Sequence, residues 1–287
     1  WAIENDVDLV ALSFVRCADD LLPVLERIAD AGSPIRVIAK IERPEAVADI
    51  DAILRAADGL MVARGDLGVE TGLVRVPLMQ KSLIDQCRRS GKPVITATQV
   101  LESMVHDSTP TRAEVSDIAN AIYDGTDAIM LSAETATGSG PRQVVELLDC
   151  VSLATEEHIA ASESRDERGR GARSVAEALV ESAAKAAQDM GARRLVVFTK
   201  SGDTARMIAK HRCHVPVVAI TNTESTYRQM CLSYGVCPEF LPEVADFRQL
   251  LATIDRLAQE RRWAGAGDTL VVVSAIDGCA GDTDTLH

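Results

Sequence analysis

Lys40 and Glu42 are the two residues of this sequence best placed to do chemistry. They stand two positions apart at the end of an apolar run, Ile35–Ile41. Side chains two apart on a β-strand point to the same face, and the carboxyl ends of parallel strands are where α/β proteins build their sites. An ammonium group beside a carboxylate suits an anion held together with a divalent metal, although it also suits an ordinary ion pair.

Two glycines and a second carboxylate follow the next apolar run. Gly65 and Gly68 let the backbone come close to a ligand, and Asp66 lies between them. Carboxylates from two neighbouring strands are sufficient for Mg²⁺, which keeps several waters and takes its other ligands from substrate. Asp66 also fits a simpler role, which is to cap the helix that follows.

Hydroxyl and carboxylate residues end two further apolar runs. Thr98 places a hydroxyl where it can donate a hydrogen bond or relay a proton, and Ser132 and Glu134 follow the run after it. Thr111 and Glu114 have the spacing of a capping box and need no catalytic role. Each residue alone has a structural explanation, but together they indicate one polar site at one end of a parallel sheet.

The elements that must position these residues alternate regularly along the first part of the chain. Helical patterns separate short runs that are aliphatic on both faces, which is typical of buried parallel strands. We predict strands at Val7–Val15, Ile35–Ile41, Gly59–Ala63, Pro93–Thr98 and Ala128–Ser132, with helices at Leu21–Ala31, Pro44–Ala57, Pro77–Ser90 and Arg112–Tyr123.

These elements make about five βα units, whereas a closed (β/α)₈ barrel takes about 250 residues. The sheet is therefore either open or the last portion of a barrel. The chain opens on Trp1 with a helix-like stretch already under way. We favour a partial TIM (β/α)₈ barrel in an N-terminally truncated fragment of something longer.

A second, smaller α/β domain is predicted beyond a linker. A helical pattern runs from Pro141 to about Ala161, and the charged, glycine-bearing residues 162–173 lack any apolar period, as an exposed linker does. We place the barrel portion at residues 1–161 and a domain with a mainly parallel sheet at residues 174–287. Its predicted elements are helices Ser174–Met190, Asp203–Lys210, Ser225–Tyr234 and Phe247–Arg261 and strands Arg194–Phe198, Val215–Ile220 and Asp268–Val273.

Composition excludes several classes of protein. The formal net charge is −13, with 30 Lys and Arg against 43 Asp and Glu, whereas nucleic-acid binders need a basic surface. No apolar run reaches the roughly 20 residues of a membrane span, and no signal peptide opens the sequence. The seven cysteines are scattered without a C-x-x-C, which favours a reducing compartment. We expect a cytoplasmic protein that binds neither nucleic acid nor membrane.

Five segments carry a resemblance to a known family. In order, they are IRVIAKIERPEAV, MVARGDLGVE, PVITATQVLESM, PTRAEVSDIANAIYDGTDAIMLSAET and VVFTKSGDTA. They closely resemble pyruvate kinase over essentially the whole chain. The resemblance implies the second half of a catalytic barrel followed by the C-terminal regulatory domain. It also implies a homotetramer that transfers a phosphoryl group from phosphoenolpyruvate to ADP, giving pyruvate and ATP in the last step of glycolysis.

The resemblance implies a role for each of the main candidates. Lys40 matches the lysine that stabilises the transferring phosphoryl group, and Glu42 and Asp66 match the ligands of Mg²⁺ or Mn²⁺. Gly65 and Asp66 match the segment that receives the substrate carboxylate. Thr98 matches the threonine that binds this carboxylate and lies near the protonation path of the enolate.

Other family features are altered or unmatched. Ser132 and Glu134 match the neighbouring wall of the site, with no direct chemistry, and Ala133 replaces the usual glycine between them. The family's K⁺ ligands, a phosphate-binding arginine and the nucleotide lid match nothing in this sequence. We therefore expect the 287-residue chain alone to have negligible kinase activity.

A loop in the second domain resembles the effector-phosphate loop of members that sugar phosphates activate. The matching residues are Thr199, Lys200, Ser201, Gly202 and Thr204. Asp203 and Asp277 add negative charge where a bisphosphate would lie, and like charges repel. This argues against activation by fructose 1,6-bisphosphate and leaves a monophosphate or a vestigial site as alternatives.

Two other functions remain open. A Mg²⁺-dependent aldolase or lyase acting through a pyruvate enolate also uses a glutamate and an aspartate from successive strand ends, but it lacks the lysine and the second domain. A non-catalytic remnant that binds an effector or partner subunits is the other alternative. The kinase interpretation requires Lys40, Glu42 and Asp66 to gather around one magnesium ion.

Overall fold

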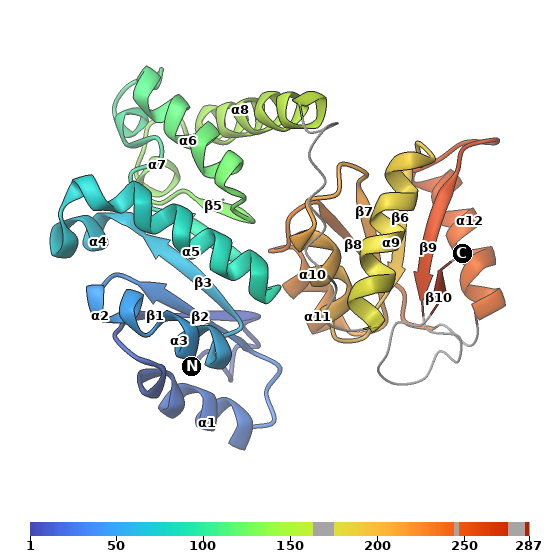
Figure 1. The fold of residues 1–287 in the computed structure, drawn as a ribbon, viewed down its shortest axis with the longest axis horizontal. Helices are drawn as coiled ribbons and strands as arrows, with labels where there is room; N and C mark the ends of the chain where they lie inside the picture. The colour runs from blue at the N-terminus through green and yellow to red at the C-terminus, as the bar shows by residue number, and fades with distance from the viewer. Residues whose placement is uncertain (163–174, 244–246, 275–284, 287) are drawn as a thin grey trace. The chain divides into compact units, whose positions relative to one another are not determined.

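The computed structural model describes residues 1–162, 175–243, 247–274 and 285–286. The chain divides into two compact units, Trp1–Glu167 and Arg168–His287, and each unit has its own sheet (Figure 1). The predicted linker, residues 162–173, lies outside the described residues except for Ser162, which ends a helix.

Five parallel strands form the sheet of the first unit, and their spatial order follows their order in the sequence. Successive βα units of a barrel produce this arrangement, because each crossover places the next strand beside the last. The strands are β1 (Leu9–Val15), β2 (Arg36–Ile41), β3 (Gly59–Ala63), β4 (Val94–Ala97) and β5 (Ala128–Met130). All five predicted strands are confirmed.

Helices cover the outer face of this sheet. Alternate residues such as Ala39, Ile41, Leu60 and Val62 pack with the first helices into one buried cluster. A second cluster joins the last helices to the segment that follows β4. The helices are α1 (Leu22–Asp30), α2 (Pro44–Ala48), α3 (Ile50–Ala56), α4 (Arg64–Thr71), α5 (Val76–Ser90), α6 (Arg112–Asp124), α7 (Ala133–Ala136) and α8 (Pro141–Ser162), with 3₁₀ turns η1 (Ala18–Leu21), η2 (Leu73–Arg75) and η3 (Glu102–Val105).

Two predictions about helices in this unit were wrong. The first six residues form turns rather than a helix. The helix expected over Pro44–Ala57 is broken at Asp49, whose carboxylate accepts the Ala18 N–H at 2.9 Å. Helix α4 was not among the helices given a range, although Asp66 was considered as a cap for a following helix.

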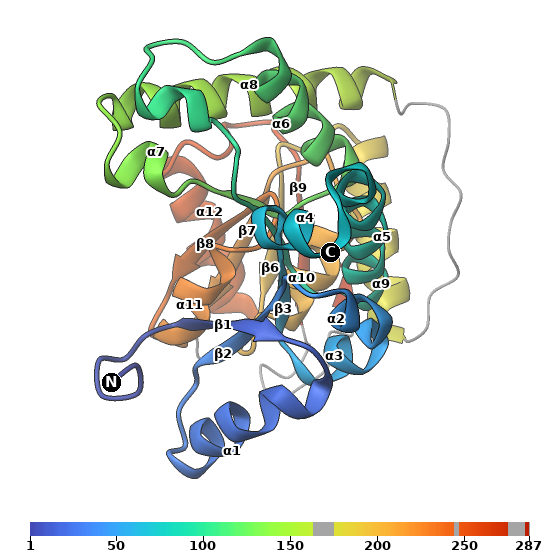
Figure 2. The ribbon, with the colours of Figure 1, turned by 90° about the vertical axis from the view of Figure 1, so that its left-hand side faces the viewer.

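The inner face of the sheet is less covered than the sequence suggested. β1 lies at the edge of the sheet (Figure 2), and Ala11, Ser13 and Phe14 are exposed. All three residues of β5, the other edge strand, are half-buried. The expectation that every strand is buried on both faces was therefore wrong for the two edge strands, each of which has only one neighbouring strand.

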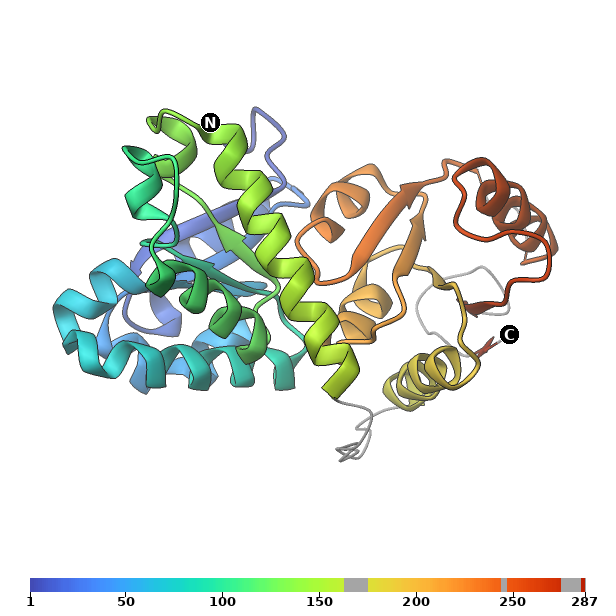
Figure 3. The same ribbon diagram turned by 90° about the horizontal axis from the view of Figure 1, so that it is seen from above.

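The second unit is a sheet with helices on both faces. Its strands lie in the order β10-β9-β6-β7-β8, and every pair is parallel except β9 with β10. Helices α9 and α10 pack on one face and α12 on the other, as Figure 3 shows. The elements are α9 (Val175–Asp189), β6 (Arg194–Phe198), α10 (Asp203–Lys210), β7 (Val217–Thr221), α11 (Glu224–Met230), β8 (Val236–Phe240), α12 (Phe247–Glu260), β9 (Leu270–Ser274) and β10 (Thr285–Leu286).

Strand β8 was not predicted from the sequence. Pro238 and Glu239 interrupt its apolar pattern, and proline is tolerated only where a strand has a free edge. β8 lies at the edge of the sheet, which is such a place. None of the described helices in either unit has the length and apolar character needed to cross a bilayer.

Candidate active site

The side chains of Lys40 and Glu42 meet at the C-terminal end of β2. Lys40 Nζ lies 2.8 Å from Glu42 Oε1, and only 1% of the Glu42 side chain is exposed. A buried carboxylate is costly unless it is paired and hydrogen-bonded. The predicted placement of this pair on one face of the strand is confirmed.

An irregularity at the end of β1 supplies two further partners. The register of β1 against β2 shifts by one residue where Ser13 and Phe14 pass Lys40. Lys40 Nζ donates to Ser13 Oγ at 2.8 Å, and the Phe14 N–H donates to Glu42 Oε2 at 2.7 Å. Phe14 has a φ of 57°, which a bulky residue rarely adopts. Sequence reasoning missed both residues, because an extra residue in a strand leaves no mark on an apolar pattern.

Gly65 and Thr98 form a second polar pair, at the ends of β3 and β4. The Gly65 N–H donates to Thr98 Oγ1 at 2.8 Å, and the Thr98 hydroxyl donates to the Ala97 carbonyl at 2.6 Å. Gly65 is the second residue of α4, so its N–H is one of the unpaired donors at a helix N-terminus. Such a donor beside a hydroxyl suits a carboxylate ligand.

Asp66 is exposed in the first turn of α4, beyond the strand that neighbours β2. It makes no hydrogen bond or ion pair with any residue that the structure describes. Arg43, just after β2, ties this helix in place through Glu70 at 2.7 Å. Asp66 is thus a free carboxylate on a helix fixed to the end of β2.

Glu42 and Asp66 are carboxylates, the ligand type that a hard divalent ion prefers, and they follow neighbouring strands. Within the described ranges, no three or more His, Cys, Asp or Glu side chains cluster around one point. Mg²⁺ accepts such a small protein set, because it retains waters and takes oxygen ligands from substrate. Glu42 Oε2 accepts one hydrogen bond and Oε1 pairs with Lys40, and each oxygen has a further lone pair that an ion could use.

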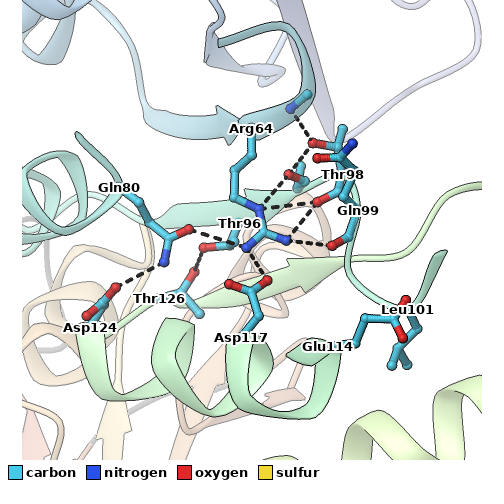
Figure 4. A network of polar contacts seen from close by, with 12 residues as sticks. Arg64, Gln80, Thr96, Thr98, Gln99, Leu101, Glu114, Asp117, Asp124 and Thr126 are labelled. Carbon is cyan, nitrogen blue, oxygen red and sulfur yellow. Dashed lines mark hydrogen bonds and ion pairs between the residues drawn. The ribbon is translucent and has the colours of Figure 1, made fainter. Parts of the chain in front are cut away.

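Arg64 is a site residue that sequence reasoning missed. Its side chain is 8% exposed and pairs with Asp117. Its guanidinium donates to the carbonyls of Ala97, Thr98 and Gln99 at 2.7 to 3.4 Å, as Figure 4 shows. The sequence did hold a signal for it, an arginine placed directly between an apolar strand and Gly65. An arginine next to a buried strand is itself buried only when it is paired, so its position indicated a partner elsewhere in the chain.

Glu134 stabilises the wall of the site. Its carboxylate accepts the N–H of Ser132 at 2.7 Å and that of Leu101 at 3.2 Å, and the residue is 1% exposed. Burial opposes the charged form, but the backbone N–H donors outweigh it and hold the pKa of Glu134 below its usual value. Glu134 thus joins the end of β5 to the segment after β4.

The capping box predicted at Thr111 and Glu114 is present at the start of α6. Glu114 also accepts hydrogen bonds from the N–H and hydroxyl of Ser103, at 2.8 and 2.6 Å. Burial again opposes its charge, yet these donors and those of Thr111 lower its pKa. The box therefore fixes η3 against α6, a structural role.

The candidate effector loop joins β6 to α10 in the second unit. Thr199 is buried and accepts the Gly202 N–H at 3.0 Å, while Lys200 is exposed. The Ser201 hydroxyl donates to Asp203 at 2.6 Å. The remaining members of this loop are Thr204, which is buried, and Asp203, which also pairs with Arg206. The Asp277 position lies outside the described residues.

Comparisons with known proteins identify the family. The description "Pyruvate kinase, barrel domain" matches residues 1–145, and "Pyruvate kinase, alpha/beta domain" matches residues 177–287. The chain belongs to the pyruvate kinase family. The parallel sheet of the first unit is therefore part of the family's barrel, and the second unit is its α/β domain.

Several curated pyruvate kinases are similar along this whole chain. That of Geobacillus stearothermophilus is 42% identical over 289 residues, and that of Sporosarcina psychrophila is 41% identical over 293 residues. In both cases the alignment covers 100% of this chain and 49% of the relative. The pyruvate kinase of Corynebacterium glutamicum is 40% identical, with 60% of its length covered. The chain thus spans about half the length of the curated relatives it matches.

Replacement of Glu134 by glutamine should change the acid stability of the first unit. Because its pKa is lowered on folding, ionised Glu134 contributes stability above about pH 4.5, and that contribution is lost as pH falls through the folded pKa. We expect Glu134→Gln to cost about 1–3 kcal/mol at pH 7 and less at pH 3.5, measured by urea unfolding.

The matched control is Glu102→Gln, because Glu102 is an exposed glutamate at the start of η3. We expect its unfolding free energy to follow the parent protein at both pH values. Equal destabilisation by Glu134→Gln at pH 7 and pH 3.5 would contradict the role given to the charge.

Proposed function

We propose that this protein transfers the phosphoryl group of phosphoenolpyruvate to ADP, forming pyruvate and ATP. The observation that carries the proposal is the Lys40 ammonium, held at 2.8 Å from both Ser13 Oγ and Glu42 Oε1 at the end of β2. The Gly65–Thr98 pair, which suits a carboxylate, lies at the ends of the next two strands. Phosphoenolpyruvate carries its phosphoryl-bearing oxygen and its carboxylate on the same carbon atom, and these are the two groups this site suits.

Lys40 acts on the phosphoryl group. In the reaction the bond from phosphorus to the enol oxygen breaks, and a bond to the terminal phosphate oxygen of ADP forms. Negative charge spreads over the phosphoryl oxygens in the transition state. A lysine fixed by two partners offsets that charge without having to reorganise.

Gly65 and Thr98 orient the substrate through its carboxylate. The Gly65 N–H now donates to Thr98 Oγ1 at 2.8 Å, and the Thr98 hydroxyl donates to the Ala97 carbonyl. A bound carboxylate would accept the N–H in place of the Thr98 oxygen, and the hydroxyl would rotate to donate to it. The enolate that leaves the phosphorus takes a proton at its terminal carbon to become pyruvate. Because Thr98 would bind the carboxylate of the same small molecule, it is our candidate for orienting the proton donor.

Glu42 and Asp66 would hold Mg²⁺ or Mn²⁺. Such an ion, when bound, polarises the phosphoryl oxygens and stabilises the enolate. Within the protein, the buried Glu42 carboxylate pairs with Lys40 and accepts the Phe14 N–H. A requirement for K⁺ is expected from the family, with its ligands outside this chain.

We further propose that the protein is cytoplasmic and assembles as a homotetramer. Four large apolar side chains are exposed within ten residues of sequence, on α4, η2 and α5. They are Val69, Leu73, Val74 and Leu78, at 85%, 74%, 89% and 69% exposure. An apolar patch of this kind marks a contact with another protein surface, here a second copy of the chain.

For the loop at Thr199–Thr204 we propose at most a weak phosphate site. The Asp203 carboxylate sits at the start of α10, where an anion would bind, and already pairs with Arg206. A phosphate would have to compete with this carboxylate. This supports a monophosphate or a vestigial site over a bisphosphate site.

Replacement of Lys40 tests the proposed reaction. In the protein at its natural length, Lys40→Met should lower kcat for phosphoenolpyruvate and ADP by about 10³-fold or more, because no other cation replaces the ammonium. Pyruvate formation is followed with a coupled dehydrogenase. Lys185→Met, which removes an exposed lysine of the second unit, should leave kcat unchanged.

Turnover that survives Lys40→Met would contradict the role of the lysine. Release of pyruvate from a 4-hydroxy-2-oxo acid without ADP would instead favour the lyase. A natural-length protein with neither activity would favour the remaining alternative, a non-catalytic protein that binds an effector or partner subunits.

Gly65→Ala should damage substrate binding without damaging the fold. An added Cβ would lie 3.5 Å from Thr98 Oγ1, an ordinary contact, and alanine is favoured over glycine in a helix. The methyl group would, however, intrude on a carboxylate bound between Gly65 and Thr98. We expect KM for phosphoenolpyruvate to rise about 10-fold to 200-fold with no loss of Tm.

Gly265→Ala, in the second unit, is the control. Its added Cβ would also make only an ordinary contact, and we expect KM for phosphoenolpyruvate to stay that of the parent protein. An unchanged KM for the Gly65 variant would remove Gly65 from the carboxylate site.

Val74→Asp should weaken assembly. Val74 is 89% exposed, so the charge costs the isolated subunit little but is desolvated in a contact between copies. Sedimentation should show a smaller species than the parent protein forms. Val175→Asp, at 76% exposure in the second unit, is the control, and equal sedimentation of the two variants would contradict the proposed surface.

A further inference from the structure

The backbone that carries the Thr98 hydroxyl is strained. Thr98 has a φ of 69° and Gln99 a φ of 54°. Two successive residues with side chains in the left-handed region are unusual, and a β-branched threonine there is an outlier. Such conformations persist only where the surroundings hold them, and they gather at functional sites.

Arg64 supplies the contacts that hold this backbone. Its Nη2 donates to the carbonyls of Thr98 and Gln99 at 2.7 and 3.1 Å. Its Nε donates to the carbonyls of Ala97 and Thr98 at 3.4 and 3.2 Å. One planar guanidinium therefore binds three consecutive carbonyls, which the single ammonium of a lysine does not match.

Without these contacts, the position of Arg64 would be energetically unfavourable. It is the first residue of α4, where the helix dipole disfavours a cation. Burial adds a further cost, which the Asp117 carboxylate offsets. Arg64 Nη1 donates to Gln80 Oε1 at 3.5 Å, and Gln80 Nε2 donates to Asp124 Oδ2 at 3.0 Å. The chain thus places a buried cation against the dipole of its own helix and surrounds it with acceptors (Figure 4).

We propose that Arg64 is a positioning residue that acts through Thr98. Its guanidinium fixes the left-handed turn after β4, so that the Thr98 hydroxyl faces the Gly65 N–H at 2.8 Å and both are set for the substrate carboxylate. Arg64 itself does not touch substrate. This inference rests on the proposed function, because it assigns a step in binding phosphoenolpyruvate.

A double-mutant cycle in the natural-length protein tests the proposal. Arg64→Lys keeps the positive charge but loses the planar guanidinium that binds several carbonyls at once. We therefore expect KM for phosphoenolpyruvate to rise about 10-fold to 100-fold while KM for ADP stays unchanged. In a Thr98→Ala background the same change should have no further effect, within about twofold. In a Thr98→Ser background, which keeps the hydroxyl, the full effect should return.

Effects of Arg64→Lys and Thr98→Ala that multiply would overturn the proposal, because Arg64 would then act independently of the hydroxyl. Equal increases in KM for both substrates would also overturn it, since a general loss of structure does not single out phosphoenolpyruvate. Arg36→Lys is the matched control. Arg36 pairs with Asp58 at 3.1 Å at the opposite end of β2, and we expect both KM values to remain those of the parent.

Should Arg64→Lys fail to fold, Asp117→Asn carries the test. Asp117 is 40% exposed, and its loss loosens the guanidinium without removing it. We expect a smaller increase in KM for phosphoenolpyruvate that vanishes in the Thr98→Ala background, and an increase that persists there would overturn the proposal. A parent protein that neither binds nor converts phosphoenolpyruvate would overturn the proposed function, whereas multiplied effects in an active protein would overturn only the role of Arg64.

Discussion

The need to satisfy one buried carboxylate organises the rim of the first sheet. Glu42 is 1% exposed, and a charge in such a place must be paired and hydrogen-bonded. Lys40 supplies the opposite charge, and the irregular end of β1 supplies the Phe14 N–H and, for the lysine, the Ser13 hydroxyl. The contacts that stabilise the buried Glu42 carboxylate also fix the Lys40 ammonium group at the end of β2. An ammonium group fixed there could act on an anion.

A second buried charge, Arg64, has the corresponding role at the ends of β3 and β4. Arg64 is surrounded by carbonyls and one carboxylate, and its contacts coincide with the strained residues Thr98 and Gln99. Strain of this kind is stored only where surrounding structure over-determines it. The two halves of the site therefore share one principle, in which an ion buried beside a strand end fixes the polar group that faces the ligand.

The two units differ in how their polar groups are committed. In the first, Asp66 makes no hydrogen bond or ion pair with any described residue, and the Gly65 N–H and the Thr98 hydroxyl bond to neutral groups only. In the second, the Asp203 carboxylate already pairs with Arg206 at the start of α10. A negative group bound in place makes a helix N-terminus a poorer anion site. The first unit thus keeps a carboxylate without such a partner among the described residues, while in the second a carboxylate occupies the place that we propose for a phosphate.

The sequence alone determined the alternation of strands and helices, the end of the sheet where the site lies, and the pairing of Lys40 with Glu42. These follow from local periodicity, because side chains two apart on a strand share a face. Tertiary structure alone decided the bulge that brings Ser13 to Lys40, the left-handed turn at Thr98, and the burial of Arg64. Those features arise where different strands meet, so their cause is a contact between residues far apart in the chain, and no periodic pattern within one segment records it.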